Sequence, residues 1–207
     1  MSWGDAIMLI SEFSTGLYER LPGKSESRSR PFVCDGSPLI CRTFIVGYNA
    51  ANNLGAFSQF WSDEDGFNKR LFEKKYVESG KSLENRAANR YWIRTISDAV
   101  GNCLETNIYS TSSEKADSLP LSARTSETFD YLFNSIKPHT IFCYNQKTLK
   151  FFQKRIGKSI PLISEGGRPA QASMSGHSFR IIGHNHGWLS RAKPYVDNLI
   201  ETLRLTP

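Results

Sequence analysis

The 207-residue sequence lacks the features that mark several large classes of protein. Its cysteines, at positions 34, 41, 103 and 143, have none of the short spacings of zinc sites, which predicts a reduced, cytoplasmic protein without a metal. There is no basic segment followed by an apolar one at the N-terminus, so no secretory signal is expected. The uncharged stretch 43–62 is interrupted by amide side chains and does not predict a membrane span.

Several catalytic motifs are also missing. The sequence contains no G-x-S-x-G nucleophile elbow, no phosphate-binding P-loop and no paired-carboxylate motif. The adjacent residues Asp63, Glu64 and Asp65 indicate a solvated acidic turn. Four scattered histidines do not predict a metal site, and we expect no cofactor.

The composition is that of a globular protein. Hydrophobic residues make up 39% and charged residues 22%, and the length fits one domain with a single core. We expect that domain to span residues 1–207, with an N-terminal helix at about 5–21 and a polar linker at about 24–30.

The positive charge is concentrated in the last two fifths of the chain. The formal net charge is +6, but residues 1–120 carry 14 basic and 15 acidic side chains, whereas residues 121–207 carry 12 and 5. This excess indicates either a solvated basic face or a surface that binds phosphate groups, where lysine and arginine gain affinity by releasing counterions.

Apolar runs alternate with helical patterns along the chain. Such alternation predicts an α/β fold with a mainly parallel sheet. The strands are expected at 42–48, 103–109, 140–144 and 179–183. The main helices are expected at 84–100, 125–136, 146–156 and from Ser190 or Lys193 to about 203.

Polar residues follow three of these strands. Ligand sites in parallel sheets lie outside the carboxyl ends of the strands, where Asn49, Asn107 and His184 are expected. Asparagine offers a hydrogen-bond donor and an acceptor together, and histidine can donate to a leaving group that gains negative charge. Each residue also has an ordinary interpretation, as a turn former, a cap or a structural histidine.

Three short motifs resemble the uracil-DNA glycosylase superfamily. The run 44–50 (FIVGYNA) resembles its first motif, a strand followed by G-x-N-P or G-x-D-P, and 106–109 (TNIY) is similar to its middle strand. The run 183–190 (GHNHGWLS) resembles its second motif. The order and spacing agree over residues 40–205, and the run from Arg30-Pro31-Phe32 to Ser37-Pro38-Leu39 is shared with bacterial members of unassigned role.

This resemblance implies a three-layer α/β/α fold with a central four-stranded sheet, and an enzyme that excises uracil or another deaminated base from DNA. Such an enzyme flips the nucleotide out of the helix into a pocket. By resemblance, Asn49 orients the attacking water and His184 donates to the departing base. The implied substrate-binding residues are Gly47, Tyr48, Phe60, Trp61, Asn107 and His186.

The resemblance also implies a DNA-binding loop before the last helix. Trp188 and Leu189 fall where the family inserts an apolar wedge into the base stack. Ser190, Arg191 and Lys193 begin the last helix, whose N-terminus suits a phosphate, and Gly187 precedes them. The expected partner is single- or double-stranded DNA, with no membrane, and the protein is expected to be a monomer.

The chain departs from the family pattern at two places. Ala50 replaces the proline of the first motif, and Asn185-His186 replaces the Pro-Ser of the second, so the catalytic donor is either His184 or His186. Two alternative functions therefore stay open. One is a member of this fold that binds nucleic acid without excising a base, and the other is a hydrolase of free nucleosides or nucleotides.

Overall fold

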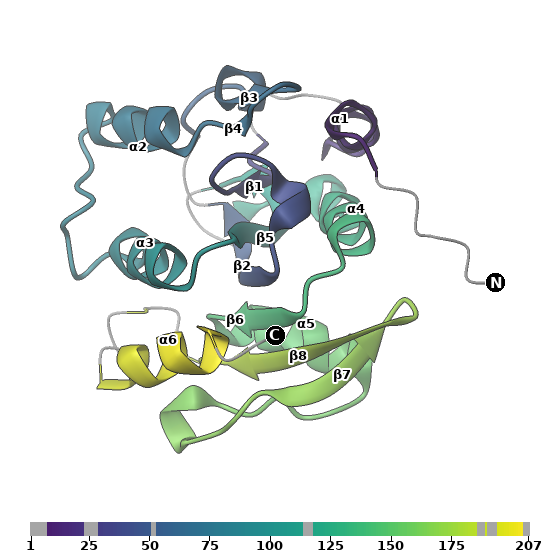
Figure 1. The fold of residues 1–207 in the computed structure, drawn as a ribbon, viewed down its shortest axis with the longest axis vertical. Helices are drawn as coiled ribbons and strands as arrows, with labels where there is room; N and C mark the ends of the chain where they lie inside the picture. The colour runs from purple at the N-terminus through teal and green to yellow at the C-terminus, as the bar shows by residue number, and fades with distance from the viewer. Residues whose placement is uncertain are drawn as a thin grey trace.

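A computed structural model of the chain describes residues 8–22, 29–50, 53–113, 118–185, 189 and 194–204. It is a mixed α/β protein whose central sheet has six strands and is flanked by helices (Figure 1). In chain order the strands of this sheet are β1 (Phe32–Val33), β2 (Thr43–Ala50), β5 (Cys103–Ser112), β6 (Thr140–Cys143), β7 (Ala170–Met174) and β8 (His177–Gly183). A separate two-stranded sheet joins β3 (Trp61–Ser62) to β4 (Gly66–Phe67).

The strand order of the large sheet is β1-β5-β2-β6-β8-β7. The four central strands are mutually parallel and are the four that the sequence predicts. The expected count of four strands is too low, because β1 pairs antiparallel with β5 and β7 pairs antiparallel with β8. The β7–β8 hairpin turns at Ser175 and Gly176, whose φ angles of 52° and 75° suit a tight two-residue turn.

The helices cover both faces of the sheet (Figure 1). They are α1 (Ile10–Glu19), α2 (Lys69–Glu78), α3 (Asn89–Val100), α4 (Glu127–Ile136), α5 (Gln146–Ile156) and α6 (Val196–Arg204). Side chains along β2 alternate between two cores: Phe44 and Val46 pack on the side of α1, α4 and α5, and Ile45 packs on the side of α3 and α6. None of the described helices is long and apolar enough to cross a membrane.

Several element boundaries differ from those predicted. The N-terminal helix begins at Ile10, after the extended residues Met8 and Leu9. Most of the predicted linker lies outside the described residues, but its last two residues belong to the sheet edge: Ser29 bridges to Thr111, and the Arg30 amide donates to the Ser110 carbonyl at 2.8 Å. Hydrogen bonding along β5 therefore orders the end of a segment that composition alone marks as polar linker.

Candidate functional site

The connectivity of the parallel strands marks one place at the edge of the sheet. From β2 the chain crosses to β5 on one side, and from β5 it crosses back to β6 on the other side of β2. The carboxyl ends of β2 and β6 therefore flank a topological switch point, where ligands bind in open α/β sheets.

Four residues form a row across this edge. In the sheet register Val46 lies beside Thr106 and Cys143, and Cys143 lies beside Gly183. The next residue on each strand gives the row that we call the edge row, which consists of Asn107, Gly47, Tyr144 and His184. Gly47 pairs directly with Asn107 in the register.

Two backbone hydrogen bonds continue the ladder into the edge row. The Tyr144 amide donates to the Val46 carbonyl at 3.2 Å, and the His184 amide donates to the Cys143 carbonyl at 2.7 Å. The His184 side chain is fully buried. The sheet thus places three residues expected at the site in one row, with Gly47 beside Asn107 and His184 separated from Gly47 by Tyr144.

Gly47 leaves room for two polar side chains. A Cβ atom at this position would lie 2.5 Å from Asn107 Oδ1 and 2.6 Å from Tyr144 Cζ, and closer still to the Tyr144 hydroxyl. Non-bonded heavy atoms do not approach this closely, so only glycine fits beneath the amide and the phenol. The carboxamide of Asn107 and the hydroxyl of Tyr144 therefore share the space above the Gly47 Cα.

Asn107 is 2% exposed, and its Oδ1 accepts no hydrogen bond from any described residue. Leaving such an acceptor buried without a partner costs about 1–3 kcal/mol. A buried polar atom of this kind calls for an explanation, and a site that accepts a ligand donor is one.

A buried charge cluster lies two residues before Asn107 on β5. The Glu105 carboxylate is 5% exposed; it pairs with the guanidinium of Arg90 on α3 and lies 3.9 Å from that of Arg30. Both guanidiniums also lie over the ring of Phe72, at 5.7 and 5.8 Å from its centroid. This cluster fixes β5 against α2 and α3 and leaves an excess of positive charge beside the edge row.

Asn49 lies two residues beyond Gly47, inside β2 rather than in a loop. Its Nδ2 donates to the carbonyl and to the hydroxyl of Ser113, both at 3.0 Å, and the Ser113 amide donates to the Ala50 carbonyl at 2.8 Å. Tyr48 packs edge-on against Tyr109, with ring centroids 5.0 Å apart. The last residues of β5 and Ser113, which follows them, therefore hold Tyr48 and Asn49 of the first motif in place.

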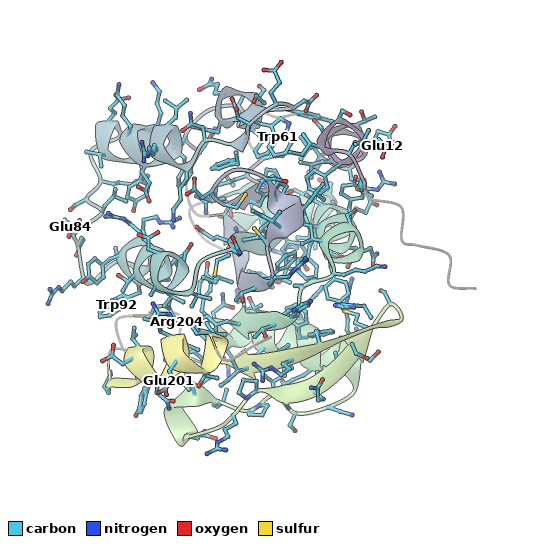
Figure 2. All side chains as sticks on the ribbon, in the orientation of Figure 1. Glu12, Trp61, Glu84, Trp92, Glu201 and Arg204 are labelled. Carbon is cyan, nitrogen blue, oxygen red and sulfur yellow. The ribbon has the colours of Figure 1, made fainter. Side chains whose placement is uncertain are left out.

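The two aromatic residues expected to stack on a base pack in the core on the α1, α4 and α5 side of the sheet, whereas Tyr144 packs in the core on the α3 and α6 side. Phe60 is 5% exposed and packs against Phe67 and Phe72. Trp61 is half-buried and its Nε1 donates to Ser14 of α1 at 3.1 Å; Figure 2 shows it beside that helix, on the opposite side of the molecule from α6. Both side chains pack among the aromatic residues of this core, and Phe60 also borders a small pocket with Arg30 and Ser112.

Leu189 differs from the expected exposed wedge. It is fully buried against α3 and α6, and its amide donates to Asn89 Oδ1 at 2.7 Å. The other expected residues of this loop lie outside the described residues; they are His186, Gly187, Trp188, Ser190, Arg191 and Lys193.

Tyr144 is the residue of the edge row that sequence reasoning missed. It ends an apolar run, a position that also fits the last residue of a buried strand. The signal is that Tyr144 directly follows a parallel strand, as His184 does. Burial raises the pKa of its hydroxyl above the ordinary range, so the phenol stays neutral at physiological pH.

No group of three or more histidine, cysteine, aspartate or glutamate side chains within the described ranges is arranged to hold a metal ion. The chemistry available at the edge row is therefore that of amide, phenol, imidazole and backbone groups. No protein-family model and no curated protein matches the chain.

Proposed function

We propose that this protein is a DNA glycosylase-like hydrolase, which cleaves the N-glycosidic bond of uracil or another deaminated base in DNA. The observation that supports the proposal is the edge row: Asn107, Gly47 and His184 come from three separate motifs and meet at one row of the sheet. A shared site requires such an arrangement, and the register of the parallel strands supplies it.

In the proposed reaction the base enters over the carboxyl edge and Asn107 binds its hydrogen-bonding edge. The N-glycosidic bond breaks with its electron pair on the base, and His184 donates a hydrogen bond to the base carbonyl as charge develops. Water then adds to the sugar carbon and loses a proton, which passes to solvent or to the departed base anion. Asn49 orients that water, but an amide cannot take its proton, so we expect a slow enzyme.

Two features favour a second candidate function, a protein that binds nucleic acid without excising a base. The Asn49 amide nitrogen is occupied by Ser113, and the phenol of Tyr144 fills the space above Gly47. A binding protein of this kind should show affinity for DNA that falls steeply with salt, and no abasic product.

The proposal is tested by incubating the protein in excess with single- and double-stranded oligonucleotides that contain uracil, hypoxanthine or xanthine. Alkali then cleaves any abasic product. We expect slow formation of abasic sites with at least one base. Absence of product with all three bases, in both strand forms, would refute the proposal.

Variants test the assignment of the site. Asn49→Ala removes the group that orients the water, and His184→Ala removes the donor to the departing base. Each should reduce product formation by roughly 10²-fold or more. Asn134→Ala, on the exposed surface of α4, and His177→Ala, at the amino end of β8, are the matched controls. Equal rates for a site variant and its control would overturn the assignment of that residue.

A further inference from the structure

Tyr144 has no part in the reaction as proposed above, yet its hydroxyl lies at the centre of the edge row. It directly follows β6, across the switch point from Asn107 on β5. The two side chains approach the same point from opposite sides, above the bare Cα of Gly47. One carries a hydroxyl that donates, and the other carries a carbonyl oxygen that accepts.

The Asn107 carbonyl oxygen and the Tyr144 hydroxyl offer a ligand complementary hydrogen-bonding groups. Asn107 Oδ1 is a buried acceptor with no donor among the described residues. The Tyr144 hydroxyl is a donor on a side chain that is 8% exposed. A ligand that offers an N–H to the first and a carbonyl or ring-nitrogen acceptor to the second would satisfy both.

We propose that Tyr144 is a specificity-determining residue, whose hydroxyl binds the acceptor next to the N–H group that Asn107 binds on a nucleobase ring. The pair accordingly selects planar rings that carry a donor and an acceptor on adjacent atoms, such as the cyclic amide of uracil or hypoxanthine. Glycine at position 47 allows both side chains to reach the ring edge.

The surroundings of Tyr144 support its role as a donor. Its ring packs in the core formed by β2, β6, α3 and α6, which restricts the positions open to the hydroxyl. Desolvation by burial is the main cause that raises the pKa of the phenol, and the nearby Glu105 carboxylate raises it further. The proton needed for donation is therefore retained even in mildly alkaline solution.

The test is a binding titration of free bases, followed by chemical shifts of ¹⁵N-labelled protein. The probes are 1-methyluracil, whose N3–H and neighbouring carbonyls are intact, and 1,3-dimethyluracil, in which methyl groups replace both ring N–H groups. Wild-type protein should bind 1-methyluracil and reject 1,3-dimethyluracil. Tyr144→Phe should weaken the binding of 1-methyluracil roughly three- to tenfold, the effect of one neutral hydrogen bond.

Two further variants complete the design. Tyr91→Phe removes a hydroxyl from α3 instead of from the edge row, and it should keep the wild-type preference for 1-methyluracil. Asn107→Leu removes the acceptor and should abolish the preference for 1-methyluracil. Circular dichroism establishes that each variant is folded, and Asn107→Leu tests the donor–acceptor pair independently if Tyr144→Phe does not fold.

The inference rests on the proposed function only in taking a nucleobase as the ligand, and the two can fail separately. Selective binding without excision of any base would refute the proposed function and leave the role of Tyr144 standing. No binding of 1-methyluracil to wild type, equal binding of both probes, or unchanged affinity in Tyr144→Phe would overturn the inference, whatever the excision assay shows.

Discussion

Replacing Gly47 by alanine tests the packing of the edge row directly. The new methyl group would lie 2.5 Å from Asn107 Oδ1 and 2.6 Å from Tyr144 Cζ. Both neighbours are buried, so neither can withdraw into solvent. Inserting a methyl group into a packed interior costs about 1–3 kcal/mol. For a chain of this length, that cost lowers the melting temperature by roughly 2–4 °C per kcal/mol.

The assay is urea unfolding of wild type, Gly47→Ala, Tyr144→Phe and the double variant. Tyr144→Phe removes the atom nearest to the new methyl group, so the double variant should be more stable than the sum of the single effects predicts. Such non-additivity is expected for residues in contact. A Gly47→Ala protein with the wild-type urea midpoint would refute the close approach of Tyr144 and Asn107 to position 47.

Three more predictions concern stability. Glu105→Gln should destabilise the fold by about 3–5 kcal/mol in urea unfolding, because it leaves the buried Arg90 guanidinium without its carboxylate; Asp98→Asn, in the partly exposed pair with Lys69, is the control and should cost about 0–1 kcal/mol. Leu189→Ala should cost about 2–5 kcal/mol, as for a core leucine, and a wild-type melting temperature would instead indicate an exposed wedge. Burial raises the pKa of the Cys103 thiol from 9.0 to about 12. Above pH 9 the unfolded chain therefore binds fewer protons than the folded protein, and the free energy of unfolding should fall between pH 9 and pH 12. Equal urea midpoints at neutral pH and at about pH 10 would contradict this.

The elements with strong apolar periodicity were predictable from the sequence. The helix predicted at 146–156 is α5 with the same bounds, and the four parallel strands are all present. The missed elements have weak patterns. In α2 most side chains are polar or charged, and only Phe72 and Tyr76 are buried, four residues apart. In β7, an edge strand, small and polar residues alternate. Pairing with β8, and not the intrinsic strand propensity of these residues, makes this segment a strand.

The candidate site was predictable in its location but not in its composition. Asn49, Asn107 and His184 could be chosen because each carries a polar group at or near the end of a predicted strand, although Asn107 lies inside β5, which continues to Ser112. Tyr144 was missed because an aromatic residue at the end of an apolar run also fits a packed core. The contact between its hydroxyl and Gly47 joins two strands far apart in sequence, and no local pattern reports it.

Because β2 extends through Ala50, Asn49 does not depend on a proline at position 50 to hold its side chain in place. In a loop, a rigid residue after Asn49 would be needed to hold the amide in place. Here the pairing of Asn49 with Tyr109, and the bond from the Ser113 amide to the Ala50 carbonyl, hold it through the neighbouring strand. A change in the length or sequence of the segment that follows should therefore leave Asn49 in place.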